Sequence, residues 1–115
     1  MKKKTRRYEY YLTDVFGNIT PTDDTEEFGR WIKYADRQIG LTRIFGITIS
    51  TVALGINYNF GEGEPDIFET MIFGGAENQY CERYSTIKQA ETGHKEAVWL
   101  AIKTLPKSIY EAVKF

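Results

Sequence analysis

The sequence predicts an α+β fold: an N-terminal β-hairpin, a helix, an antiparallel sheet of about four further strands, and a C-terminal helix packed on that sheet. Two stretches, 24–39 and 86–105, place apolar residues three and four positions apart, as one face of a helix does. Between them, 41–58 and 67–73 are rich in alternating β-branched and apolar residues, as strands are. With 115 residues, of which 42% are hydrophobic, the chain suits one domain, 1–115, with a packed core.

Charge and cysteine content exclude several kinds of partner. The 15 basic and 16 acidic residues give a net charge near −1, which supplies no overall field to attract DNA, RNA or an anionic membrane. Cys81 is the sole cysteine and no residue spacing suits a zinc site, so we expect no metal and no cofactor. No apolar run approaches the ~20 residues of a membrane helix, and the basic start lacks the apolar stretch of a signal peptide. We expect a soluble protein of a reducing cytosol.

The first element expected is a β-hairpin. A tyrosine-rich run, 7–12, precedes the turn sequence 14–18, in which Gly17 or Asn18 supplies the positive φ of a tight connection. A short strand, 19–20, follows, and Pro21 is expected to end it. Residues 1–6 lie outside this pattern, and we expect a flexible basic tail rather than a nucleic-acid arm.

A helix is expected next, because Asp24 lies three positions before Glu27, in the spacing of a capping box. Gly40 is expected to end it. The predicted apolar face comprises Phe28, Trp31, Ile32, Ala35 and Ile39, and the basic residues Arg30, Lys33 and Arg37 lie on the other side. A solvated basic face is favoured over an anion-binding one.

Strands are expected at 41–45 and 47–58, joined by a turn at Gly46. In the second of them, the apolar residues shift from odd to even positions near Ser50 and Thr51. Either a β-bulge at this point or a strand buried on both faces would explain the shift.

A glycine-rich acidic loop, 60–66, leads to a strand at 67–73, which ends at Gly74 and Gly75. The loop is a poor phosphate site, because it lacks the lysine and hydroxyl of a P-loop and contains Glu62 and Glu64. A strand-connecting turn or a cation-facing loop is favoured, although the ligand spacing of an EF-hand is missing. One further short strand is expected at 80–84.

The last long helix is expected to begin after Thr86, which is spaced for a capping box with Gln89. Gly93 costs about 1 kcal/mol relative to alanine inside a helix, which indicates close approach of another backbone or of a ligand. Pro106 ends the helix, and 106–115 is expected to form a C-terminal arm. The predicted core face comprises Ile87, Ala90, His94, Ala97, Val98, Ala101 and Leu105.

Three polar residues are candidates for a site. His94, the single histidine, is either a hydrogen-bonded core residue or a base, and a base needs a positioned partner. Glu69 lies on a strand face with apolar neighbours, so it either pairs with Arg43 or Arg83 or points into a pocket. Arg83 is either an ordinary surface or strand-pairing arginine or a ligand for phosphate or carboxylate.

Aromatic residues gather in the central part of the chain. Such rings can stack on a planar base, although core packing and subunit contacts explain most of them equally well. The edge strands of so small a sheet need covering, so we expect a homo-oligomer with pockets between its subunits. The aromatic residues concerned are Tyr58, Phe60, Phe68, Phe73, Tyr80 and Tyr84.

The segment from Ala35 to His94 resembles a widespread group of small, mostly uncharacterised phage-encoded proteins. Their pattern is close to STVxLGxxxxFGxGxPxxFETMxFGG and then RYSTxxxAxxGH, and this chain has STVALGINYNFGEGEPDIFETMIFGG and then RYSTIKQAETGH. The relatives commonly carry a histidine where this chain has Tyr58 or Asn59. A mechanism that relies on that histidine is therefore not expected here.

The resemblance implies a phage accessory protein, made in the cytoplasm of the host bacterium, of a kind that often opposes host defence. By analogy with proteins that sequester nucleotide-derived immune signals between subunits, we expect a non-enzymatic oligomer that binds a small nucleotide-like ligand. Arginine would contact phosphate, aromatic rings would stack, and the 61–63 loop would complete the pocket. The residues expected to bind the ligand are Arg83, Glu69, Thr70, Arg43, Tyr58, Phe60, Tyr84 and His94.

Two functions of other classes stay open. One is a protein-interaction inhibitor of a host defence enzyme, which needs an exposed apolar or aromatic patch. The other is a small hydrolase that uses His94 and Glu69, which requires these two side chains to lie within hydrogen-bond reach of each other or of a substrate.

Overall fold

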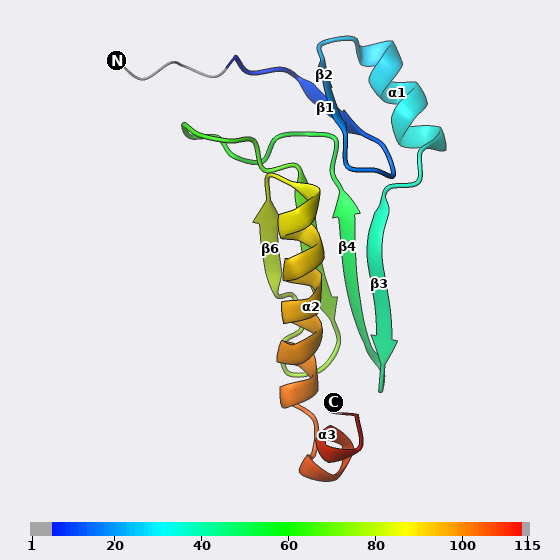
Figure 1. Cartoon of the computed structure of the whole chain (residues 1–115), viewed down its shortest axis with the longest axis vertical. Helices are drawn as coiled ribbons and strands as arrows, with labels where there is room; N and C mark the ends of the chain where they lie inside the picture. The colour runs from blue at the N-terminus through cyan, green and yellow to red at the C-terminus, as the bar shows by residue number, and fades with distance from the viewer. Residues whose placement is uncertain (1–5, 114–115) are drawn as a thin grey trace.

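A computed structural model describes residues 6–113 and confirms the predicted α+β class. A two-stranded hairpin and one helix lie at one end of a four-stranded antiparallel sheet, and the longest helix packs on that sheet (Figure 1). In chain order the elements are β1 (Tyr10–Thr13), β2 (Ile19–Thr22), α1 (Thr25–Tyr34), β3 (Gln38–Ile44), β4 (Ile47–Ala53), β5 (Phe68–Phe73), β6 (Cys81–Tyr84), α2 (Ile87–Lys103) and α3 (Lys107–Val113).

The predicted hairpin is present, and Gly17 has the expected positive φ, 86°. Pro21 was predicted to end the second strand, and this is wrong. It lies inside the strand, opposite Tyr11. A proline is tolerated there because β2 pairs only with β1 and its other edge is free within the described chain. Of the predicted tail, 1–5 lie outside the described residues, whereas Arg6 forms an ion pair of 2.9 Å with Asp23.

Helix α1 begins as predicted, because the Asp24 carboxylate accepts the backbone N–H groups of Glu26 and Glu27. The prediction that it continues to Gly40 is wrong, since it ends at Tyr34. The Asp36 carboxylate accepts the N–H of Gln38 at 3.1 Å, and this local turn competes with further helical hydrogen bonds. Ile39 and Gly40 consequently belong to β3.

The main sheet has the strand order β3-β4-β5-β6, and every neighbouring pair is antiparallel. The turn at Gly46 is confirmed: both Phe45 and Gly46 have positive φ, as a two-residue hairpin connection requires. Neither explanation considered for the shift near Ser50 holds for β4: its burial alternates without interruption, so it has no β-bulge and is buried on one face only. An irregularity lies instead in the neighbouring strand β3, between Gln38 and Gly40.

Helix α2 covers one face of this sheet, and the odd-numbered residues of β4 with the even-numbered residues of β5 point toward it. The opposite face, which we call the open face, has no helix over it in the described part of the chain (Figure 1). Strand register assigns to the open face Leu41, Arg43, Thr48, Ser50, Val52, Glu69, Met71, Phe73, Cys81 and Arg83. The molecule measures only 22 Å along its shortest axis, which fits one sheet and one helix layer.

The capping box at the start of α2 is confirmed, with Thr86 and Gln89 in reciprocal hydrogen bonds. Gly93 has the close neighbour that its position predicted, but this neighbour is the Tyr84 side chain rather than a backbone or ligand. A Cβ at Gly93 would overlap the Tyr84 hydroxyl and ring. Beyond Pro106 the predicted arm contains the short helix α3, and 114–115 lie outside the described residues.

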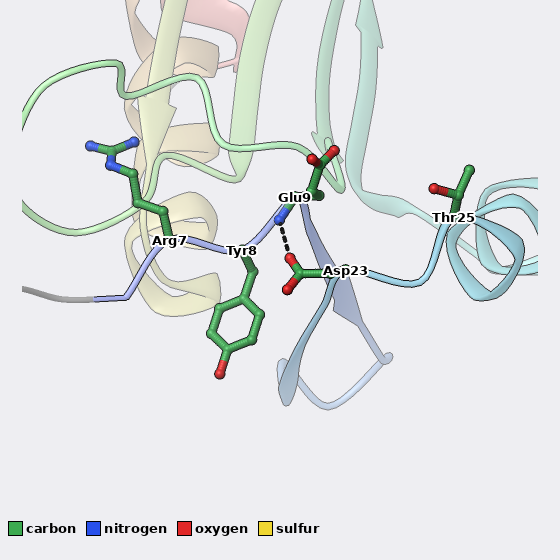
Figure 2. Close-up of a pocket in the computed structure, with 5 residues that line it drawn as sticks. All are labelled: Arg7, Tyr8, Glu9, Asp23 and Thr25. Atoms are coloured by element: carbon green, nitrogen blue, oxygen red, sulfur yellow. Dashed lines mark hydrogen bonds between the residues drawn. The ribbon is translucent and has the colours of Figure 1, made fainter.

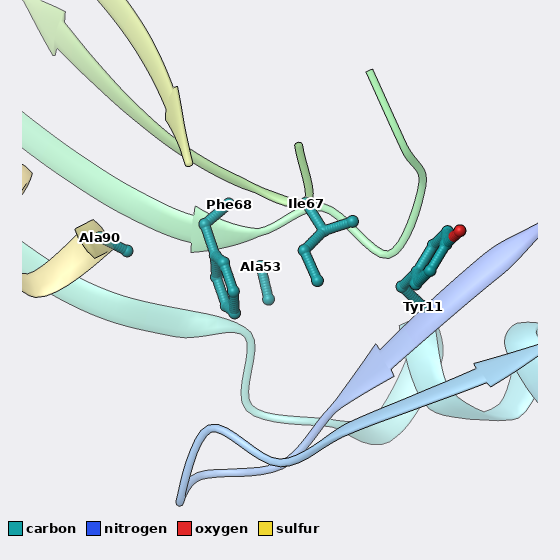
Figure 3. Close-up of a cluster of buried hydrophobic side chains, with 5 residues drawn as sticks. All are labelled: Tyr11, Ala53, Ile67, Phe68 and Ala90. Carbon is teal, nitrogen blue, oxygen red and sulfur yellow. The ribbon is translucent and has the colours of Figure 1, made fainter. Parts of the chain in front are cut away.

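The hydrophobic core joins the hairpin to the sheet and to α2. Tyr11 from β1 packs with Ala53, Ile67, Phe68 and Ala90, all of them buried (Figure 3). A second buried cluster lies further along α2 and comprises Ile47, Ile49, Ile72, Ala97 and Ala101. The site residues on the sheet are therefore held on a rigid, packed layer.

Candidate functional site

Strand alternation divides the predicted site residues between the two faces of the sheet. Glu69 is half-buried on the open face, whereas its neighbour Thr70 is fully buried beneath α2. Arg83 and Arg43 lie on the open face, while Tyr84 and His94 lie on the helix side. Tyr58 and Phe60 belong to the loop that follows β4. The eight residues therefore do not share one concavity.

Four of the eight residues form a cluster at one end of the open face, which we call the aromatic–arginine corner: Tyr58, Phe60, Glu69 and Arg83. The Arg83 Nε donates to a Glu69 carboxylate oxygen at 2.9 Å, across the directly paired positions of β5 and β6. The Arg83 guanidinium lies 4.8 Å from the centre of the Tyr58 ring. Tyr58 in turn meets Phe60 edge to face, with ring centres 6.4 Å apart.

The electrostatics of the corner follow from this ion pair. The Glu69 side chain is 15% exposed and that of Arg83 41% exposed, so the pair is only partly screened by water. The hydrogen bond from Arg83 to Glu69 raises the pKa of Arg83 above its ordinary value. Of the two alternatives considered for Glu69, the structure shows the ion pair, and of the two arginines considered its partner is Arg83. Arg43 lies two strands from β5, on the opposite edge strand β3.

The corner presents a fixed guanidinium face and two accessible rings, of which Phe60 is 88% exposed. A planar group can stack on such rings, and an anionic oxygen can approach the guanidinium N–H groups not used by Glu69. Glu69 cancels most of the charge of Arg83, so a strongly anionic ligand needs a further cation. Arg7 lies near, since its guanidinium donates to the Asn59 carbonyl at 2.6 Å.

On the other side of the sheet, half-buried His94 bonds a row of threonine hydroxyl groups, of which those of Thr51 and Thr70 are fully buried. Its Nδ1 lies 2.7 Å from the Thr51 hydroxyl and its Nε2 lies 2.9 Å from the Thr42 hydroxyl. Thr51 also bonds the Thr70 hydroxyl at 2.5 Å. Burial lowers the pKa of His94, so the ring is neutral at pH 7. Both ring nitrogens are occupied by hydroxyl groups of the sheet, which is the arrangement of a core histidine.

Tyr84 ends this buried region. Its ring packs against Gly93, and its hydroxyl is buried without a hydrogen-bond partner of acceptable geometry among the described residues. Burial raises the pKa of Tyr84, and the nearby Thr70 hydroxyl lowers it by a smaller amount.

The geometry bears directly on the hydrolase alternative. Glu69 points to the open face and His94 lies between the sheet and α2, so the sheet itself separates the two side chains. They cannot act on one substrate as an acid and base pair.

Sequence reasoning missed a shallow hollow of about 490 Å³ beside the hairpin, lined by Arg7, Tyr8, Glu9, Asp23 and Thr25 (Figure 2). Asp23 accepts the Glu9 N–H there at 2.9 Å. The register of the hairpin would have indicated this hollow, because the pairing of Tyr10 with Thr22 brings Glu9 next to Asp23. The hollow is widely open, and its Asp23 carboxylate already pairs with Arg6 and with the Glu9 N–H.

Two classes of site have no counterpart within 6–113. No group of three or more His, Cys, Asp or Glu side chains there is arranged to hold a metal ion. None of the helices in that range has the length and apolar character needed to cross a membrane.

Comparison of the chain with protein-family models, curated proteins and solved structures found no match.

Proposed function

We propose that this chain is a non-catalytic binding protein that dimerises through the open face of its sheet and holds a small nucleotide-like ligand at the aromatic–arginine corner. The supporting observation is that a fixed arginine–aromatic cluster lies at the rim of a sheet face that no described helix covers. One wall of a ligand site is thus preformed in each subunit. The second subunit supplies the other wall.

The composition of the open face supports contact with a second copy. Leu41 and Phe73 are 45% and 48% exposed there. Met71 lies beside Phe73 on β5, Val52 lies further along β4 opposite Glu69, and Thr48 and Ser50 lie between these apolar residues. Exposed apolar side chains gathered on one sheet face are normally buried against another layer. The near-zero net charge of the chain opposes self-association very little.

The positions of the two arginines suggest how the subunits are related. Arg43 and Arg83 lie on opposite edge strands and at opposite ends of the ladder, so they occupy diagonal corners of the open face. A two-fold axis perpendicular to that diagonal exchanges the corners and packs the two sheets nearly at right angles, a known mode of sheet packing. Arg43 of the partner subunit then lies beside Arg83.

This arrangement provides a second cation beside Arg83, in addition to Arg7 of the same subunit. Arg83, Glu69 and Arg43 of the partner subunit together carry a net charge of +1, next to the rings of Tyr58 and Phe60. An aromatic base would stack on the rings, and phosphate oxygens would accept hydrogen bonds from the two guanidinium groups. In the phage context that the sequence resemblance implies, the ligand would be a nucleotide-derived defence signal, and binding would sequester it in the host cytoplasm.

Calorimetric titration with cyclic nucleotides and cyclic ADP-ribose isomers tests the proposal. We expect one ligand to bind, and Arg43→Ala and Arg83→Ala each to weaken it by at least about tenfold, the size of one lost charge-assisted hydrogen bond. Phe73→Glu, which separates the subunits, should abolish binding, while Tyr34→Glu on exposed α1 should not. Absence of heat with every compound contradicts the nucleotide ligand. Loss on Arg83→Ala but not Arg43→Ala contradicts the two-subunit site.

A second candidate rests on the same apolar residues of the open face. Leu41 and Phe73 can equally anchor a protein partner, such as a host defence enzyme that the chain inhibits. The two candidate functions predict different oligomeric states for the protein without a partner. The first predicts a dimer, and the second predicts a monomer. If the purified protein is monomeric, capture from host lysate by the wild type but not by Phe73→Glu supports this candidate.

A further inference from the structure

A second surface lies away from the open face, where the sheet edge at β6 meets α2. We propose that the groove between β6 and α2 binds an extended peptide segment of a partner protein, which adds to the free edge of β6 and carries a lysine or arginine facing Glu82 and Glu96. The proposal does not depend on dimerisation or on the nucleotide-like ligand. It rests on the backbone of β6, the shape of the groove and its charge.

The backbone of β6 offers hydrogen-bonding groups at an open edge. β6 is the last strand of the sheet, and no described strand pairs with its outer side. The carbonyls of Tyr80 and Tyr84 accept hydrogen bonds from the N–H groups of Ile72 and Ile67. The backbone N–H and C=O groups of the even-numbered residues therefore point toward β5. In an antiparallel ladder the intervening residues point the other way. The N–H and C=O groups of Cys81 and Arg83 therefore face outward and can pair with an added strand.

A shallow, open groove of about 400 Å³ lies between Tyr84, the last residue of β6, and one side of α2. Gly93 lacks a side chain where the Tyr84 ring crosses the helix, which keeps the floor of the groove low. The buried Tyr84 hydroxyl lies at this floor without a partner among the described residues. The remaining lining residues are Lys88, Gln89, Thr92 and Glu96. A helix that lies beside a free strand edge forms a groove in which an extended peptide can bind.

Charge identifies the kind of peptide. Glu96 lines the groove, and Glu82 lies on the same face of β6 as Tyr84, because its β5 partner Thr70 faces α2. Lys88 lies two helical turns before Glu96, so the groove has one basic and one acidic end. In an antiparallel added strand, the residue opposite Tyr84 comes two positions before the residue opposite Glu82. An apolar residue at the first position and a basic one at the second match this surface.

The test is an NMR titration of the full chain with the peptide acetyl-Ser-Thr-Val-Thr-Lys-Thr-amide. We expect amide shifts at Cys81, Arg83 and 88–96, and at least tenfold weaker binding when glutamate replaces the lysine, which is about 1.4 kcal/mol. Glu96→Lys should reverse that preference. Cys81→Pro should lose binding because it removes an outward N–H at the first residue of the strand, while Cys81→Ala, which keeps the N–H, should retain it.

Several results would overturn the proposal. They are an absence of shifts at the highest peptide concentration, shifts confined to the open face, equal binding of the lysine and glutamate peptides, or equal binding by Cys81→Pro and Cys81→Ala. If Cys81→Pro does not fold, Glu96→Lys decides, because it changes an exposed helix residue and needs no change in the strand. Since Phe73→Glu leaves this groove intact, peptide binding by that variant separates this proposal from the dimer.

Discussion

Substitution of Gly93 by alanine should destabilise the protein, although the same change inside an ordinary helix stabilises it. Alanine gains about 1 kcal/mol over glycine in a helix interior. At Gly93, however, the new Cβ would lie well inside 3.0 Å of the Tyr84 hydroxyl and ring, closer than real Cβ contacts come. Overpacking of this kind costs about 1–3 kcal/mol, or more when neighbours cannot move. We expect a net loss of up to about 2 kcal/mol, and more if Tyr84 cannot move.

Gly29 provides the matched control, because it lies inside α1 and an added Cβ there would meet nothing within 4 Å. Gly29→Ala should stabilise the protein by up to about 1 kcal/mol. Urea unfolding measures both changes, and in a thermal scan 1 kcal/mol corresponds to roughly 4 °C for a chain of this size. In a Tyr84→Val background the penalty at Gly93 should disappear. If Gly93→Ala stabilises the wild-type protein as much as Gly29→Ala does, the proposed contact with Tyr84 is wrong.

Three further predictions concern the buried hydroxyl row and the first helix. Thr51→Val removes the hydroxyl that bonds both Thr70 and His94, and urea unfolding should show a loss of about 1–3 kcal/mol. Because burial holds the pKa of folded His94 below its ordinary 6.5, the unfolded chain takes up this proton first; stability should be constant above that pH and fall as the pH drops below it. His94→Gln should flatten this fall, and an unchanged profile would contradict the assignment. Asp24→Ala should cost about 1 kcal/mol, whereas Asp24→Asn, which keeps the cap, should cost much less.

Local sequence signals predicted most of the fold. The hairpin turn at Gly17, the caps at Asp24 and Thr86, and the turn at Gly46 are all confirmed, because each depends on residues within four positions of one another. The end of α1 was missed because no glycine or proline marks it. Apolar spacing continues through Ile39, and it is the turn at Asp36 that ends the helix.

The alternation near Ser50 was misread for a different reason. Thr51 points to the helix side although it is polar, because Thr70 and His94 satisfy its hydroxyl there. With polar Thr51 on the buried face and apolar Val52 on the open face, the apolar residues shift from odd to even positions without any change in the strand. Such an inversion depends on side chains 19 and 43 residues away in sequence, which periodicity does not report.

The sequence named the four residues of the aromatic–arginine corner but did not indicate that they lie together. The sequence left open whether Glu69 pairs with Arg43 or Arg83 or points into a pocket, and strand register pairs it with Arg83. It also grouped Glu69 with Thr70, although alternation along β5 sends adjacent side chains to opposite faces. The stacking of Arg83 on Tyr58 depends on the path of the 54–66 loop, which no local pattern specifies.

The mass of the purified protein in solution tests the central proposal most directly, because that proposal requires the open face to be the contact between two copies. The chain has a mass of 13.3 kDa, so light scattering coupled to size-exclusion chromatography should give twice this value for the wild type. Phe73→Glu should return the mass to that of one chain, and Tyr34→Glu should leave the dimer intact. A wild-type mass of 13.3 kDa at all accessible concentrations, or a dimer that Phe73→Glu does not dissociate, would contradict the proposal.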